Sequence, residues 1–167
     1  MKEHTARSRE TAKTVVGLLS KHDLTIAVAE ATCCGLIAYL LTCVSGSSGC
    51  FLGGLSPYST YSKTSVVGIP DTLLTAKGSV SREVALDMAS RAQILFNADI
   101  GLAETGIAGP CGGTHSKPVG LFYIAISTSL NQGICKEFRL SGQRDKIRQH
   151  AALSALDLVE KYLRQLI

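Results

Sequence analysis

Hydroxyl and amine side chains that could cleave an amide lie close together in segment 45–63. The segment holds Ser47 and Ser48 in a serine- and glycine-rich turn, and Lys63 follows. A neutral lysine can take the proton of a serine hydroxyl, and the alkoxide then attacks an amide carbon. The lysine must lose its own proton near neutrality, which requires burial or a neighbouring cation. Because most lysines are solvated surface residues, the pair needs independent support.

A glycine-rich segment over residues 105–114 is a second candidate. Its sequence, Thr-Gly-Ile-Ala-Gly-Pro-Cys-Gly-Gly-Thr, is too rich in glycine to continue a strand or helix. Successive backbone amides in such a loop can surround an anion. The segment lacks the spacing of the phosphate-binding loop and of the dinucleotide-binding motif. A flexible surface loop is the alternative.

The six cysteines are expected to be reduced and mainly structural. No CxxC spacing occurs, Cys33 and Cys34 are adjacent, and the four histidines are dispersed, so no metal site is expected. The favoured interpretation is small apolar side chains in a core. A thiol nucleophile at Cys33 or Cys34, activated at a helix N-terminus, is a further hypothesis.

Composition limits the class of protein. The 167 residues are 46% hydrophobic and 18% charged, which favours one folded domain spanning residues 1–167. No apolar run is long enough to span a membrane, and the charged first residues do not resemble a signal peptide, so we expect a cytoplasmic protein without membrane contact. Aromatic residues make up only 5% and the net charge is only +4, which argues against nucleic-acid binding.

Helical and strand patterns alternate along the chain and predict an α/β fold. The sequence predicts a three-layer α/β/α domain with a mostly parallel mixed sheet that carries an antiparallel hairpin. Ligands gather at the carboxyl ends of such strands, which here precede residues 30–35, 58–63 and 105–114. The expected strands are 24–29, 51–58, 99–105, 119–128 and 134–140, with a hairpin turn at 131–133. The expected helices are 5–21, 35–42, 59–67, a helix from Ser81 to about Asn97, and 145–166, with a stop at 68–71.

Several ordered blocks of residues resemble the CinA C-terminal family, whose stand-alone members include nicotinamide mononucleotide deamidases. The likeness runs from about residue 10 to the last helix. The blocks are Gly46-Ser-Ser48, Tyr58-Ser59 with Lys63, Gly78-Ser-Val-Ser81 with Glu83-Val84-Ala85, Thr105-Gly-Ile-Ala-Gly-Pro110 with Gly112-Gly113, Lys117-Pro-Val-Gly120, and Ser141-Gly142 with Arg144-Asp145. Together they are far more specific than any one of them.

The resemblance implies removal of the amide of nicotinamide mononucleotide without a cofactor or metal. It implies that Ser48 is the nucleophile, Lys63 its base, and Tyr58 a second hydroxyl that moves or positions the proton. The remaining implied residues bind this small-molecule nucleotide substrate, with Arg144 holding its phosphate. They are Glu30, Thr105, Gly106, Gly109, Gly112, Gly113 and Arg144. The resemblance also suggests a homo-oligomer, most simply a dimer.

The chain departs from the family after its first predicted strand. Family members usually read Ala-Glu-Ser-Cys-Thr-Gly-Gly there, whereas this chain reads Ala29-Glu-Ala-Thr-Cys-Cys-Gly35, and Cys111 replaces a residue of the glycine loop. We expect the side chain of Cys34 to crowd the mouth of the site. Glu30 is retained and has a purely structural interpretation, as a cap of the following helix. A nucleotide-binding paralogue that keeps the fold without turnover is the alternative function.

Overall fold

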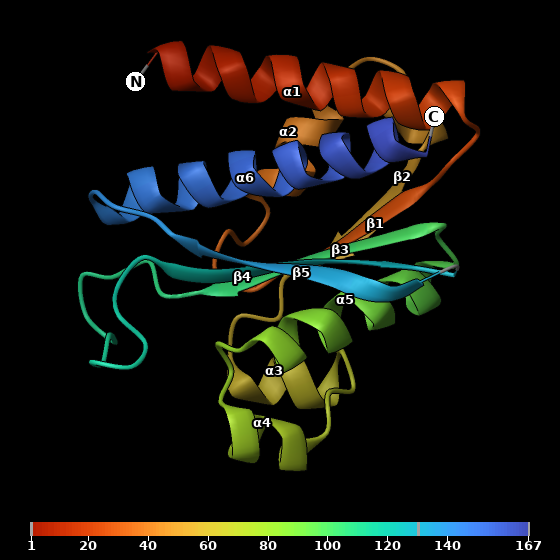
Figure 1. The fold of residues 1–167 in the computed structure, drawn as a ribbon. Helices are drawn as coiled ribbons and strands as arrows, with labels where there is room; N and C mark the ends of the chain where they lie inside the picture. Colours follow the sequence, from red (N-terminus) through yellow and green to blue (C-terminus); the bar gives the residue numbers. More distant parts are fainter. Residues whose placement is uncertain (1, 130, 167) are drawn as a thin grey trace.

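The computed structural model describes residues 2–129 and 131–166 and contains one mixed sheet (Figure 1). The strand order is β2-β1-β3-β4-β5; β2, β1 and β3 run parallel, and β4 and β5 add an antiparallel hairpin. The strands are β1 Ile26–Glu30, β2 Phe51–Leu55, β3 Ile100–Gly106, β4 Leu121–Thr128 and β5 Asn131–Arg139. The three parallel strands lie next to one another in this five-stranded sheet and place their carboxyl ends at one edge.

Helices cover both faces of the sheet, which confirms the predicted three-layer fold. Figure 1 shows α1 (Lys2–Lys21), α2 (Leu36–Thr42) and α6 (Arg144–Gln165) on one face. The other face carries α3 (Thr60–Ser65), α4 (Asp71–Lys77) and α5 (Arg82–Phe96). The loop between β3 and β4, drawn in teal, extends from the sheet at the end where α6 begins.

Strand β1 is buried along its whole length because both of its faces meet helices. Ile26 and Val28 join the apolar cluster under α1, α2 and α6, while Ala27 and Ala29 join the cluster under α5. Small residues let α5 approach the sheet closely. A Cβ on Gly101 of β3 would lie only 1.9 Å from the carbonyl oxygen of Ala89 in α5. This close packing fixes α5 against β3.

One expected turn is misplaced, and the structure adds one helix that the sequence patterns did not predict. Residues 131–133 begin strand β5 and Asn131 pairs with Thr128, so these three residues are not the hairpin turn. The expected stop at residues 68–71 does follow the end of α3 at Ser65, but the same segment also begins a helix absent from the expected elements: α4 has Pro70 at its N-cap and Asp71 in its first turn. A proline followed by an acidic residue is a helix-start signal, which the sequence analysis interpreted only as a stop.

Candidate active site

A cavity of about 350 Å³ opens at the carboxyl edge of the parallel strands. Tyr58, Lys63, Thr105, Gly109 and Arg144 all contribute to its walls. They come from the segment after β2, from the end of β3 and its loop, and from the start of α6. The structure therefore brings together most of the residues that the family resemblance singles out, among them Gly106 and Gly112.

Lys63 is a buried amine that faces this cavity. It lies on α3, whose first turn is fixed by a capping box between Ser59 and Ser62. The residue is only 3% exposed, and among the described residues its ammonium has neither a hydrogen bond nor an ion pair. Burial lowers the pKa of Lys63, while the charge of Glu104 acts in the opposite direction. The desolvation that a lysine base requires is thus present.

Glu30 caps the start of helix α2. Its carboxylate accepts hydrogen bonds from the backbone N–H groups of Gly35 (3.0 Å), Ile37 and Ala38 (both 2.9 Å). Burial raises the pKa of Glu30, and these backbone donors oppose that shift. The side chain is absent from the cavity wall. The contacts therefore support the structural interpretation of Glu30 rather than direct contact with substrate.

Glu104 of β3 lies opposite Glu30 of β1 in the sheet and is fully buried. Its Oε1 accepts hydrogen bonds from the backbone N–H groups of Thr32 and Cys33, both at 2.6 Å. Its Oε2 is buried and has no donor among the described residues. Burial raises the pKa of Glu104 to about 7; the charge of Glu30 raises it further, and that of Lys63 lowers it.

Thr32 joins the turn after β1 to the glycine loop. Its hydroxyl donates to the carbonyl oxygen of Gly106 (2.9 Å) and accepts from the N–H of the same residue (3.0 Å). Arg148 of α6 donates to the carbonyl oxygens of Thr32 (3.0 Å) and Cys33 (2.7 Å). The turn that differs from the family pattern is therefore held on two sides.

Arg144 joins the glycine loop to the segment after β2. Its guanidinium donates to the carbonyl oxygen of Gly109 (2.7 Å) and to the hydroxyl of Tyr58 (3.0 Å). Gly109 has a φ of 73°, and a Cβ there would lie 2.5 Å from Val119. Gly113 is similarly restricted, since its Cβ would lie 2.8 Å from the backbone nitrogen of Val119, whereas Gly112 has open space around it.

Thr105 fixes the position of the neighbouring segment rather than standing free. Its hydroxyl donates to the carbonyl oxygen of Ser79 at 2.8 Å, and Ser79 also lines the cavity. The bond joins the end of β3 to the segment before α5. Thr105 thereby shapes the wall that a bound molecule would touch.

Ser48 lies outside this cavity. It is an exposed residue of the 3₁₀ turn Ser47–Gly49, directly before β2, while Tyr58 and Lys63 follow the same strand. Five residues of β2 separate the two ends, a span of about 16 Å at the usual strand rise. Within one chain the structure places the predicted nucleophile and base at opposite ends of β2.

The surroundings of the two adjacent cysteines do not support the hypothesis of a thiol nucleophile. Burial raises the pKa of the Cys33 thiol, and the charges of Glu104 and Glu30 raise it further. Cys34 is exposed, has a left-handed backbone (φ 52°) and does not line the cavity. The expectation that Cys34 crowds the site is therefore wrong. All six cysteines are free thiols.

Glu104, Thr32 and Arg148 lie outside the site residues predicted from the sequence. A signal existed for Glu104, because it is the single charged residue of a strand whose first four residues are apolar or glycine and buried. Charged residues are almost never fully buried without a partner or a role. Arg148 carried no such signal, since its function depends on the packing of α6 beside the turn after β1.

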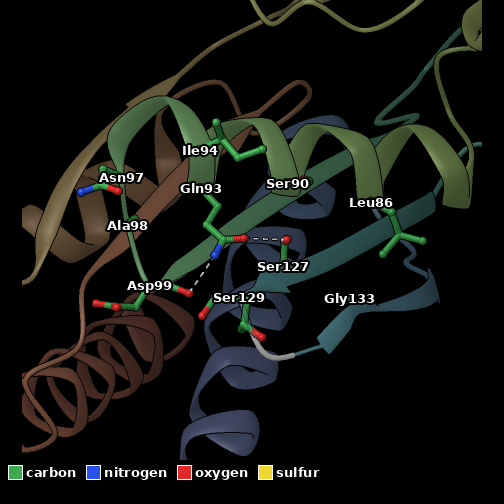
Figure 2. A pocket seen from close by; sticks show the side chains of 11 residues that line it. Leu86, Ser90, Gln93, Ile94, Asn97, Ala98, Asp99, Ser127, Ser129 and Gly133 are labelled. Carbon is green, nitrogen blue, oxygen red and sulfur yellow. Dashed lines mark hydrogen bonds between the residues drawn. The ribbon is translucent and has the colours of Figure 1, made fainter.

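A larger hollow of about 680 Å³ lies under the end of α5 (Figure 2). The amide of Gln93 crosses it, accepting a hydrogen bond from Ser127 (2.8 Å) and donating to the carbonyl oxygen of Asp99 (3.3 Å). Asp99 itself accepts from the backbone and hydroxyl of Thr25. Among the residues that the structure describes, no lysine, arginine, histidine or cysteine lines this hollow, so these residues offer no base comparable with Lys63.

Across residues 2–129 and 131–166, none of the helices combines the length and apolar character needed to cross a bilayer. In the same residues, no three metal-binding side chains of His, Cys, Asp or Glu are grouped closely enough to hold an ion.

Comparison with known proteins assigns the family. The model of the CinA C-terminal domain matches residues 8–163. The chain belongs to the CinA family. A putative competence-damage inducible protein of Thermoanaerobacter sp. (strain X514) is 46% identical over 92% of this chain. A CinA-like protein of Desulfotalea psychrophila (strain LSv54 / DSM 12343) is 44% identical over 94% of it. The chain spans only 37% and 38% of the lengths of these CinA relatives.

Solved CinA structures have the same fold. The competence/damage inducible protein CihA from Agrobacterium tumefaciens is 33% identical, with a TM-score of 0.90 over 95% of this chain and 96% of that one. A CinA superfamily protein from Klebsiella pneumoniae 700603 has a TM-score of 0.91 at 23% identity, over 95% of this chain and 98% of that one, which shows the fold alone.

Proposed function

We propose that this CinA-family chain hydrolyses the amide of nicotinamide mononucleotide, releasing ammonia and nicotinate mononucleotide. The observation that carries the proposal is the buried Lys63 beside the cavity, which has no ion-pair partner among the described residues and whose pKa is lowered by burial. A lysine in this state accepts a proton from a hydroxyl far more readily than a solvated one.

The chemistry takes two steps. The hydroxyl oxygen of Ser48 attacks the amide carbon of the substrate while Lys63 removes the hydroxyl proton. The lysine then returns this proton to the amide nitrogen, which leaves as ammonia. Water next cleaves the ester that joins the nicotinate to the hydroxyl oxygen, which restores the serine. Arg144 supports phosphate recognition, because its two hydrogen bonds use only part of a fork with five N–H donors.

We further propose that Ser48 acts in the cavity of a second copy of the chain. Strand β2 ends the sheet and contains no charged residue. Antiparallel pairing of two β2 edges around a two-fold axis would bring the start of one strand beside the end of the other. Ser48 of each copy would then approach Tyr58 and Lys63 of its partner, which resolves their separation within one chain.

The first experiment measures ammonia and nicotinate mononucleotide after the purified protein is incubated with nicotinamide mononucleotide. Lys63→Ala and Ser48→Ala are each expected to lower turnover at least about a hundredfold, and the double variant little further. Tight binding without ammonia release would instead support the non-catalytic paralogue. Absence of both would reject this substrate.

Mixing the two single variants tests the shared site. A dimer with one Ser48→Ala chain and one Lys63→Ala chain would contain one complete site and one doubly altered site. Unfolding and refolding an equal mixture should therefore restore about a quarter of the normal activity, by random pairing of the chains. Chains that stay inactive after refolding, while wild type refolds with full activity, would show that each site uses one chain only.

A further inference from the structure

Two buried carboxyl groups with different surroundings lie side by side in the sheet beneath the cavity. The register of β1 and β3 pairs Glu30 with Glu104. Glu30 accepts three backbone hydrogen bonds across both of its oxygens. Glu104 receives its two backbone donors on Oε1, and its buried Oε2 has none among the described residues.

This difference determines which carboxyl group is suited to hold a proton. A buried carboxylate oxygen without a donor is costly, whereas a carboxylic acid carries a proton on one oxygen and is neutral. The N–H donors around Glu30 stabilise its ionised form. The geometry of Glu104 leaves one oxygen available for a proton, and burial accordingly raises its pKa to about 7.

The charged form of Lys63 is destabilised in the same way, because burying an ammonium group without an ion pair also costs free energy. It lies more than 4.0 Å from every described carboxylate oxygen, yet its charge and that of Glu104 each shift the pKa of the other group. When the lysine is charged and the glutamate ionised, or when both are neutral, the two groups carry no net charge. The states with one isolated buried charge are disfavoured.

We propose that Glu104 and Lys63 form a coupled pair that holds one proton between them near neutral pH, with Glu104 acting as the positioning residue for the lysine base. Loss of the proton from Lys63 is then matched by gain of a proton at Glu104. The catalytic use of this pair rests on the proposed function, whereas the coupling itself does not.

Other charged and titratable groups surround the pair. Glu30 on β1 is the neighbouring carboxyl group, Cys33 follows β1, and Arg148 reaches the same turn from α6. The charge of Glu30 favours a protonated Glu104. Burial raises the pKa of Cys33, which keeps that thiol neutral. Lys63 and Glu104 are the two groups whose charges shift each other's pKa.

The test follows both titrations by NMR on the folded protein, with ¹³C labels at the lysine Cε and the glutamate carboxyl carbon. Lys63→Met and Glu104→Gln assign the two signals and serve as the perturbations. Glu104→Gln should move the Lys63 midpoint to lower pH, because an ionised neighbour is removed. Lys63→Met should move the Glu104 midpoint to higher pH, because a cation is removed. Glu160→Gln, at an exposed ion pair on α6, should move neither.

The coupling is rejected if neither midpoint moves in the stated direction. Should Glu104→Gln fail to fold, the Glu104 midpoint in Lys63→Met decides the question alone. Both titrations are measured without substrate, so an enzyme that lacks the proposed activity still gives a result. In an active enzyme, Glu104→Gln should retain more of its kcat/KM when the pH is lowered from about 9 to about 7, because the Lys63 midpoint has moved to lower pH. The value at pH 7 divided by the value at pH 9 should be at least about fivefold higher than in the wild-type protein. A purely structural role would lower both values and leave the ratio unchanged.

Discussion

The hydroxyl of Tyr58 accepts a hydrogen bond of 3.0 Å from Arg144, although the two residues lie 86 positions apart in the sequence. The same guanidinium holds the carbonyl oxygen of Gly109. One side chain therefore fixes both the tyrosine after β2 and the glycine loop after β3. Because Tyr58 is itself 61% exposed, this bond is what orients it toward the cavity.

Arg144→Ala should therefore raise KM for nicotinamide mononucleotide at least about tenfold, with a smaller loss of kcat, because it removes phosphate donors and loosens the loop. Arg144→Lys should rescue poorly, since an ammonium cannot hold two partners with a planar fork. Steady-state kinetics provide the measurement. Arg139→Ala, at an exposed pair with Glu137, is the control. An unchanged KM in Arg144→Ala would remove this residue from the phosphate site.

Thr32→Val tests the bridge between the turn after β1 and the glycine loop. The substitution keeps the shape but removes the hydroxyl that bonds to both backbone groups of Gly106. We expect the free energy of unfolding to fall by about 1–3 kcal/mol, because buried backbone groups lose their partner. Urea denaturation measures this loss. Thr42→Val, at an exposed hydroxyl on α2, is the matched control and should change stability by less than about 0.5 kcal/mol. Equal effects in the two variants would show that the bridge is unimportant.

The buried Glu104 should make stability depend on pH. Its pKa is raised from 4.5 to about 7, so the folded protein binds more protons than the unfolded chain between these values. Stability must then fall as pH rises through this window, by an amount on the order of 3 kcal/mol. Burial also raises the pKa of Glu30, which acts in the same direction. Glu104→Gln should flatten the slope without abolishing it.

Urea denaturation at several pH values between about 4.5 and 8 measures this slope. Glu160→Gln should retain the slope of the wild-type protein, because that carboxylate is paired at the surface of α6. The assignment to Glu104 would be wrong if Glu104→Gln and wild type lost stability in parallel across the range.

Cys34→Gly should stabilise the protein. Cys34 has a φ of 52°, a left-handed conformation that costs a residue with a side chain about 1 kcal/mol and costs glycine almost nothing. We expect a gain of about 0.5–1 kcal/mol in the free energy of unfolding, with kcat and KM unchanged because Cys34 does not line the cavity. Cys43→Gly is a matched control at an exposed cysteine with a φ of −66°, and it should not stabilise. A lower activity in Cys34→Gly would assign the thiol a role in function.

The order of segments along the chain predicted most of the cavity. Tyr58, Lys63 and Thr105 follow or end parallel strands, so the rule that ligands gather at carboxyl ends places them together. The same rule places Ser48 at the other edge, because its turn precedes β2. The family resemblance assigned Ser48 and Lys63 to one site, whereas the direction of β2 places them at opposite ends of that strand. Contacts such as those of Arg148 depend on how a distant helix packs, which no local pattern encodes.

The residues that form the cavity walls are far apart in the sequence, which affects when the cavity can form during folding. They come from the ends of β1 and β3, from the segments after β2 and before α5, and from the start of α6. The β4–β5 hairpin closes locally, whereas β1 must find both β2 and the distant β3. Local pairings form quickly and distant ones slowly. Substrate binding should therefore be among the last properties to appear during refolding, after most secondary structure has formed.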